Sequence, residues 1–222
     1  MNTSTNTSQS KASRGFTLVE MLVVIGMIAA LAGISFPVYR SIQKKVDEQQ
    51  IRMVMSSLER AVENFETEYN FMPYVGNTYP QADISQSENY GLGSGGTAEN
   101  DAFITVLAGA KSTPANFKKI KFLELNGPTG TAGNYRDGLL IKNDGSAELY
   151  NRWGNRYEVF SLDIDNDGKI WSHMDWNVEI TGKKILITCY GPDGVHGGGG
   201  FGNKDKPENQ NNVLNHDPYP GS

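Results

Sequence analysis

The sequence predicts an α+β fold, in which one long N-terminal α-helix packs on a small antiparallel β-sheet. Three observations support this fold class. An apolar run covers residues 16–36, a stripe of apolar side chains at helical spacing covers residues 38–69, and short β-type segments separated by turn residues follow position 118. Because a small sheet must bury one face, the apolar stripe of the helix is the cover that the chain provides.

Composition narrows the class of protein. The 222 residues carry 20 basic and 25 acidic side chains, and the two kinds are interspersed along a chain of net charge −5. Without a broad basic face, binding to nucleic acid is not expected. Cys189 is the single cysteine, which excludes an intramolecular disulfide and a Cys-rich zinc site.

The first two segments predict a leader and a membrane helix. Residues 1–15 are rich in Ser, Thr and Asn and contain basic but no acidic side chains, as a leader does. Within residues 16–36 only Thr17, Glu20 and Ser35 are clearly polar. As a helix this segment extends about 30 Å, the thickness of a bilayer core. We therefore expect a transmembrane helix that carries a carboxylate, Glu20, near its start.

Three explanations compete for Glu20. A secretory signal peptide could be cut after residues 30–32, Ala-Leu-Ala, but it would place the acid inside a core that such peptides keep uncharged. An uncleaved membrane anchor would keep the charged carboxylate of Glu20 inside the bilayer, which costs free energy. Cleavage between Gly15 and Phe16 would instead create an α-amine about 6 Å along the helix from Glu20. The amine of one helix and the carboxylate of its neighbour attract strongly in a low dielectric, which favours this third explanation.

These residues carry a resemblance to a known family. The stretch "RGFTLVEMLVVIGMIAALAGISFP", residues 14–37, resembles the class III leader and N-terminal helix of type IV pilins and type II secretion pseudopilins, and of the major pseudopilin above all. The resemblance implies a pilin-like fold and a prepilin peptidase that cleaves after Gly15 and methylates Phe16. It also implies that Glu20 registers neighbouring subunits and that Pro37 is the proline of the helix.

The same resemblance implies a location and a set of partners. It places the protein as a single-pass protein in the bacterial inner membrane, with its C-terminal domain in the periplasm or on a surface filament. The basic residues beyond the helix, Arg40, Lys44 and Lys45, do not settle this orientation by themselves. The implied partners are copies of the same chain in a filament, other pseudopilins, the prepilin peptidase and an inner-membrane assembly platform driven by a separate ATPase.

The second half of the helix, residues 37–71, is predicted to be amphipathic and to end before Pro73. Pro37 removes a backbone donor, so a kink is expected there. The apolar stripe comprises Ile42, Val46, Val54, Leu58, Ala61, Val62, Phe65 and Tyr69, and the other face carries Lys44, Glu48, Arg52, Glu59 and Glu66.

Residues 72–222 are predicted to form the globular domain. It begins with a loop-rich stretch, residues 72–100, followed by a short helix in "NDAFITVLAGA" with Asn100 as a candidate N-cap and Gly109 near its end. Strands are predicted at 119–125, 138–142, 156–164 and within 176–190, with Asp-Gly hairpin signals at 144–145 and 167–168. A meandering antiparallel sheet is the expected result.

One further motif lies at the start of the 156–164 strand. The stretch "NRWGNRYEVF", residues 151–160, resembles the Trp-Gly-Asn-Pro-Tyr stretch of major pseudopilins. Arg156 stands where that pattern has proline.

Two candidate calcium sites follow from carboxylate spacing and from the resemblance. Asp163, Asp165 and Asp167 precede Gly168 with the opening spacing of a calcium loop, but the twelfth position holds Met174 in place of Glu, and a solvated hairpin turn is the alternative. The stretch "YGPDG", residues 190–194, is similar to the calcium-binding C-terminal loop of major pseudopilins. The resemblance makes Asp193 the first acid of that site.

The second acid of the C-terminal site is open. Asp205 is the best-placed carboxylate, and Glu208 and Asp217 are alternatives. The surrounding Gly/Asn-rich loop, residues 191–222, buries too little apolar surface to order itself, so calcium would have a structural role there. A disordered tail is the competing interpretation.

An enzymatic function is not expected. His173, His196 and His216 lack metal-binding spacing, and neither a nucleophile elbow nor a phosphate-binding loop is present in the sequence. We predict a structural subunit of a type II secretion pseudopilus or type IV pilus-like filament that acts in protein secretion. The long segment 72–150 leaves a minor pilin for adhesion or DNA uptake open. A membrane-anchored, calcium-dependent binding domain that does not polymerise is the alternative from another class.

Overall fold

The computed structural model describes residues 16–79, 97–164, 166–171, 179–194 and 213–215. The contacts between Cα atoms divide the chain into two compact units, Met1–Val46 and Asp47–Ser222. The predicted Asp165 and Asp205 lie outside the described residues, as do the leader and Gly15.

The helix α1 covers Leu18–Tyr69 and is assigned as α-helix throughout, including at Pro37. The kink predicted at this proline stays a prediction. At its C-terminal end, Asn70 adopts a left-handed backbone with φ 59°, and its N–H donates to the carbonyl of Glu66 over 2.7 Å. Asparagine tolerates this conformation, so the helix ends at Tyr69, four positions before Pro73.

No described helix offers a stretch that is both long enough and apolar enough to cross a bilayer. The transmembrane segment predicted at residues 16–36 is therefore not confirmed.

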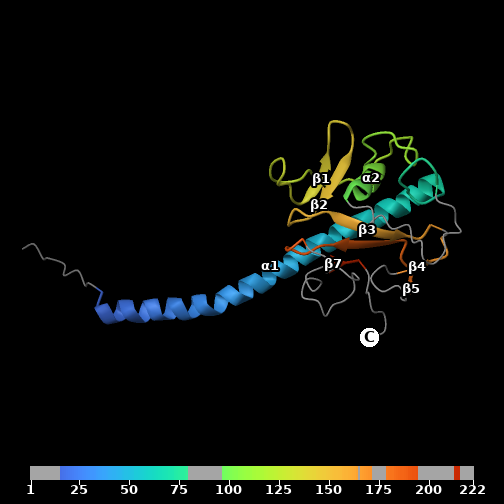
Figure 1. The fold of residues 1–222 in the computed structure, drawn as a ribbon. Coiled ribbons are helices and arrows are strands. Elements are labelled where there is room, and N and C mark those ends of the chain that lie inside the picture. Colours follow the sequence, from blue (N-terminus) through green and yellow to red (C-terminus); the bar gives the residue numbers. More distant parts are fainter. Residues whose placement is uncertain (1–15, 80–96, 165, 172–178, 195–212, 216–222) are drawn as a thin grey trace, which may run out of the picture. The chain divides into compact units, whose positions relative to one another are not determined.

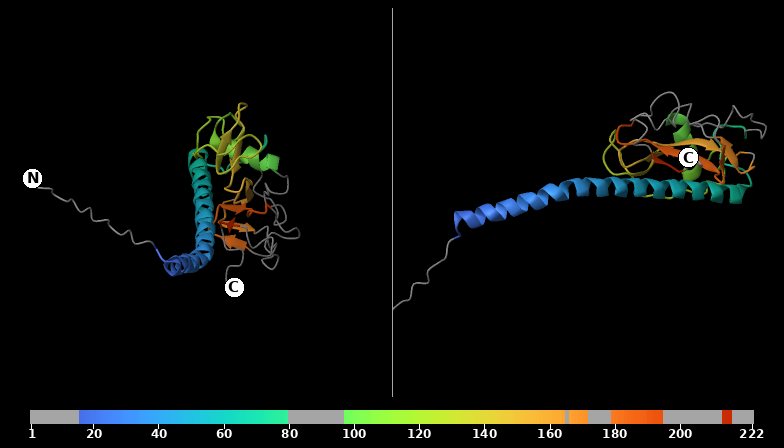
Figure 2. Two further views of the ribbon diagram at one scale, coloured as in Figure 1. Left: turned by 90° about the vertical axis from the view of Figure 1, so that its left-hand side faces the viewer. Right: turned by 90° about the horizontal axis from the view of Figure 1, so that it is seen from below.

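The second unit confirms the α+β class. It contains the helix α2 (Thr97–Ala108) and the strands β1 (Gly138–Ile141), β2 (Ala147–Tyr150), β3 (Tyr157–Leu162), β4 (Lys169–Trp171), β5 (Glu179–Thr181), β6 (Ile185–Cys189) and β7 (Val213–Leu214). The core joins one face of α1 to α2 and to the strands (Figures 1 and 2), and its fully buried side chains include Leu58, Phe65 and Phe103 from the helices and Leu149, Tyr157 and Ile187 from the strands.

The strands form three small antiparallel sheets in place of one meander. Their orders are β1-β2, β3-β6-β7 and β4-β5. The Asp-Gly signal at 144–145 correctly predicts the β1-β2 hairpin, where Lys142 N–H donates to Ser146 over 2.8 Å. The signal at 167–168 does not make a hairpin, because β4 pairs with β5 while β3 pairs with β6. The predicted C-terminal loop, residues 191–222, contains the short strand β7.

The strand predicted at residues 119–125 is absent from the described structure. Instead, the N–H groups of Phe122 and Leu123 both donate to the carbonyl of Leu107, at 2.9 and 3.0 Å. Lys119 has a left-handed backbone with φ 56°, which no regular strand contains. This segment therefore supplies hydrogen-bond donors to a carbonyl group at the C-terminal end of α2, and it does not pair with a strand.

Two polar assignments made from sequence also differ. Asn100 lies inside α2 and not at its cap, and its buried side chain donates to the carbonyl of Tyr157 in β3. Periodicity predicts that Glu59 and Glu66 face away from the apolar stripe of α1, but they pair with Lys183 and Lys184 beside β6. Long side chains at the border of an apolar stripe can reach the packed domain, which periodicity alone does not reveal.

Candidate functional site

The start of α1 is a reciprocal helix cap. Thr17 precedes the first helical residue, and its hydroxyl oxygen accepts the Glu20 N–H at 3.2 Å. In return the Thr17 N–H and hydroxyl both donate to Glu20 Oε2 at 2.9 Å. This Thr-x-x-Glu arrangement is a capping box, which satisfies backbone donors that the helix leaves open. Glu20 is thus bound within its own helix by a contact that the sequence analysis missed.

The missed contact had a signal in the sequence. A Thr followed three positions later by Glu, directly before an apolar run, marks the N-terminus of a helix. Only Oε2 of Glu20 takes part, and Oε1 accepts no hydrogen bond from a residue that the structure describes. Oε2 can therefore take part in the helix cap while Oε1 is able to accept a hydrogen bond from a second donor.

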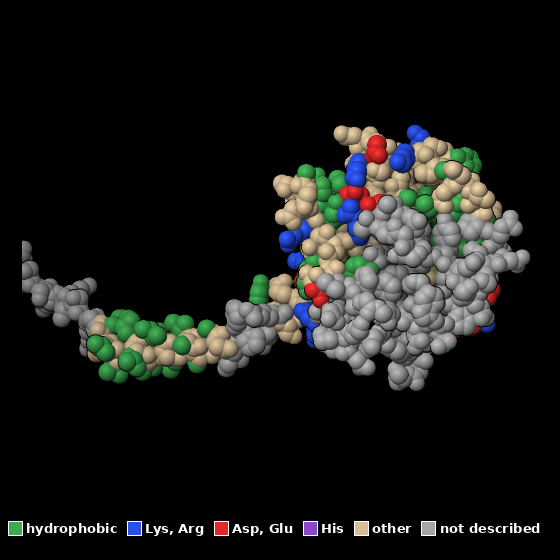
Figure 3. Space-filling view, in the orientation of Figure 1, with side chains coloured by type: hydrophobic (Ala, Val, Ile, Leu, Met, Phe, Trp, Pro, Cys, Tyr) green, Lys and Arg blue, Asp and Glu red, His purple; other side chains and the backbone are tan. Residues whose placement is uncertain are grey.

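The described surface of α1 in the first unit is largely apolar. Phe16, Leu18 and Leu22 are 74%, 81% and 65% exposed. Hydrophobic side chains follow one another along this segment in Figure 3. A contiguous apolar surface of this extent marks a contact with a membrane or with other protein chains.

A buried asparagine joins two motifs that the sequence analysis treated separately. The side-chain amide of Asn151 donates to Cys189 Sγ at 2.9 Å and to the carbonyl of Tyr190 at 3.1 Å. Its oxygen accepts the N–H groups of Trp153 and Asn155, both at 2.9 Å. Burial raises the pKa of the Cys189 thiol to about 12, although the hydrogen bond from Asn151 opposes this shift. The 151–155 turn therefore fixes the place where the "YGPDG" loop begins.

The described part of that loop contains one of the predicted calcium ligands. The Asn155 amide donates to the carbonyl of Gly191 over 2.9 Å, and Gly194 N–H donates to the same carbonyl over 3.0 Å. Asp193 lies on the surface between them. The Gly191 carbonyl already accepts these two N–H groups, so the carboxylate of Asp193 is the hard oxygen ligand of this turn that calcium would prefer.

The other candidate loop directs its first carboxylate toward its own backbone. Asp163 is 2% exposed, and its two carboxylate oxygens accept the N–H groups of Asp167 at 3.2 Å and of Gly168 at 3.0 Å. Asp167 in turn accepts the N–H of Lys169 at 2.8 Å. These are contacts of a turn, and within the described ranges no three His, Cys, Asp or Glu side chains gather as a metal site would require.

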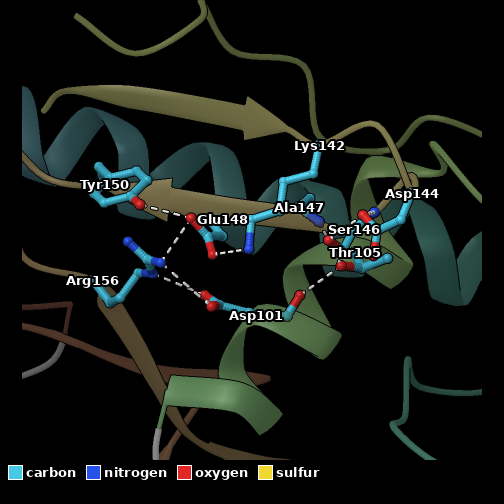
Figure 4. A network of polar contacts seen from close by, with 9 residues as sticks. All are labelled: Asp101, Thr105, Lys142, Asp144, Ser146, Ala147, Glu148, Tyr150 and Arg156. Carbon is cyan, nitrogen blue, oxygen red and sulfur yellow. Dashed lines mark hydrogen bonds and ion pairs between the residues drawn. The ribbon is translucent and has the colours of Figure 1, made fainter. Parts of the chain in front are cut away.

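Arg156, the residue that departs from the resembled pattern, is the centre of an ion-pair network (Figure 4). Its Nε lies 3.0 Å from Asp101 Oδ1 in α2, and its Nη2 lies 2.9 Å from Glu148 Oε2 in β2. The guanidinium carbon is 3.8 Å from the ring centroid of Tyr150, whose hydroxyl donates to Glu148 at 2.6 Å. Lys142 pairs with the second oxygen of Glu148. Arg156, which directly precedes β3, thus connects α2 and β2 through two ion pairs.

The network changes the acidity of its two carboxyl groups in opposite senses. Burial raises the pKa of Asp101, and Arg156 only partly opposes this. Burial also acts to raise the pKa of Glu148, but hydrogen bonds from Lys142 and Tyr150 and the charge of Arg156 outweigh it and hold that pKa below its usual value. Lys142, Tyr150 and Arg156 together therefore favour the ionised form of Glu148.

Comparison with known proteins identifies the N-terminal site. Residues 10–36 match one protein-family profile, the prokaryotic N-terminal methylation motif. The chain thus carries a prepilin-type signal of the type IV pilin-like class, at the residues where the helix cap and the exposed apolar surface lie. The match ends at residue 36, so it describes the signal and not the globular part. A search of curated proteins and a search of solved structures each gave no match.

Proposed function

We propose that this protein is a structural subunit of a type II secretion pseudopilus or a type IV pilus-like filament. In this proposal, prepilin peptidase cleaves the chain after Gly15 and methylates Phe16. The apolar part of α1 holds the mature chain in the inner membrane until an assembly platform adds it to a filament. The globular unit then lies in the periplasm or on the filament surface, where the filament acts in protein secretion.

The methylation motif carries this proposal. A peptidase that cuts before Phe16 produces an α-amine one residue before the Thr17 cap, within reach of the first turn of α1. Glu20 offers Oε1 beside its capping oxygen, so a neighbouring chain's amine has an acceptor without breaking the cap. The apolar side chains around it give neighbouring helices a surface on which to pack.

The processing step has a direct test. Expression of the full chain in cells with prepilin peptidase is expected to yield a mature protein whose N-terminal peptide begins at methylated Phe16, measured by mass spectrometry. Cells that lack the peptidase should retain residues 1–15, which serves as the control. A mature chain that begins at Gly33 would indicate simple secretion, and one that keeps Met1 beside an active peptidase would contradict the proposal.

Calcium at the C-terminal loop is a second part of the proposal. Asp193 would supply the first carboxylate, with Asp205 as the proposed second acid and backbone carbonyl groups other than that of Gly191 as further oxygen ligands. Asp163, Asp165 and Asp167 remain the less favoured candidates, because Asp163 already accepts two N–H groups of its own turn.

The calcium proposal predicts a change in thermal stability. In detergent, calcium at about one hundred times its dissociation constant should stabilise the purified full chain by roughly 2.7 kcal/mol over the chelator-treated protein. Asp193→Asn should remove most of this difference, whereas Asp167→Asn should leave it in place. Identical unfolding curves with chelator and with calcium would rule out both candidate loops.

A further inference from the structure

An exposed aromatic side chain stands on a rigidly built loop beside the C-terminal end of α1. Phe117 is 60% exposed, and its ring lies 5.6 Å from that of Tyr69. The preceding residue, Asn116, is fully buried and makes four side-chain hydrogen bonds: it donates to the carbonyls of Val106 and Ile120, and it accepts from Tyr69 Oη and Ile120 N–H. The loop is therefore held in a shape that presents Phe117 to solvent.

Three lysines follow this residue closely in the sequence. Lys118 pairs with Glu68 of α1 at 2.7 Å. Lys119 and Lys121 are exposed, and neither side chain has a partner among the residues that the structure describes. Lys119 also adopts its left-handed backbone here, a conformation that costs about 1 kcal/mol or more for a residue with a Cβ. We call Phe117, Lys119 and Lys121 the basic knob.

An acidic hollow lies along another side of α1. It has a volume of about 250 Å³, several times the roughly 30 Å³ that one water occupies. Glu59, Glu63 and Asp163 line it together with the 182–185 segment, which contributes two lysines. One of them, Lys184, is paired with Glu66. Lys183 is paired with Glu59, whereas Glu63 is exposed and its carboxylate has no partner in the described part of the chain. An unpaired acid thus stands at a cavity that can receive a side chain.

The knob and the hollow lie on opposite flanks of the same helix. Glu68, which pairs with Lys118 of the knob loop, and Glu63 of the hollow are five residues apart. At 3.6 residues per turn they are separated by about 140° around the axis of α1. A contact that joins these two different surfaces is heterologous, so each added copy leaves one knob and one hollow free, and the assembly stays open.

We propose that the basic knob of one copy docks in the acidic hollow of the next copy of this chain. The aromatic ring would fill the hollow, and Lys119 and Lys121 would approach Glu63. A buried aromatic with charged neighbours is typical of the residues that dominate interfaces. This inference rests on the proposed filament function, and it adds the contact by which the globular units of successive copies meet.

Charge reversal in the full chain tests the contact, with filaments sheared from cells as the readout. Glu63→Lys should reduce sheared filaments by about tenfold, and Lys119→Glu with Lys121→Glu should do the same, because like charges then face each other. The combination of all three should restore filaments to within about threefold of the wild type. Arg136→Glu reverses a charge that lies in neither surface and should leave filaments unchanged.

The outcomes separate this contact from the proposed function. Membrane levels and protease resistance of each variant show that it folds. Normal filaments from either reversal, or a combination no better than the single reversals, would overturn the contact while the filament function stands. If the wild type sheds no filaments although Phe16 is methylated, the filament function fails and the contact fails with it.

Discussion

Glu20→Gln is expected to abolish filaments while the chain is still exported and folded. Glutamine can replace glutamate in a capping box, because its side-chain oxygen still accepts the Thr17 N–H. It has no charge to pair with the α-amine of a neighbouring helix. In a low dielectric the loss of that ion pair should reduce sheared filaments by about a hundredfold or more.

Thr17→Ala is the matched variant, since it weakens the cap and keeps the charge. Loss of the hydroxyl removes two of the three contacts between these residues. Losing a cap changes helix stability by about 1 kcal/mol, so filaments should fall by no more than about fivefold. The opposite ranking, with Thr17→Ala defective and Glu20→Gln normal, would show that Glu20 acts as a cap and not as a charge partner.

Arg156→Met is expected to destabilise the globular unit by about 2–3 kcal/mol. The change keeps an apolar stem but leaves Asp101 and Glu148, whose side chains are 20% and 10% exposed, without their shared cation. Breaking one side of a buried ion pair costs about 3–5 kcal/mol, and partial exposure reduces this value. Denaturant unfolding of the full chain in detergent, followed by tryptophan fluorescence, measures the change.

Lys169→Met serves as the control for Arg156. Its ion pair with Glu179 joins two neighbouring strands at the surface, with side chains 52% and 34% exposed. Such pairs contribute about 0–1 kcal/mol, so its unfolding midpoint should hardly move. Equal effects of the two variants would contradict the role assigned to the Arg156 network.

The prepilin-type signal could be predicted from sequence because its determinants are local. Gly15, Phe16 and Glu20 lie within six consecutive positions, and the methylation motif matches the same stretch. The Asp-Gly hairpin at 144–145 is equally local, since the short connection between Ile141 and Ala147 sets the register of its own strands. Even the overlooked Thr17 cap depends only on residues three positions apart.

The interactions that organise the globular unit join residues distant in sequence. Periodicity predicts strands at 156–164 and within 176–190, but it does not show that β3 and β6 pair with each other while β4 and β5, which lie between them in the sequence, form another pair. Arg156 was recognised only as a departure from a pattern, and its partner Asp101 lies 55 residues earlier. Propensity describes single segments, and pairing depends on which surfaces the whole chain can bury together.

By itself the sequence determined the long helix, the prepilin-type signal and the α+β class, because helix periodicity and short motifs involve neighbouring residues. Only the tertiary structure decided that the described strands form three separate sheets and that Asn151 holds the start of the "YGPDG" loop. It also decided that the knob and hollow lie on opposite flanks of α1. Hydrogen-bond partners and exposed surfaces arise when distant segments compete for the same core, and a linear pattern does not record that competition.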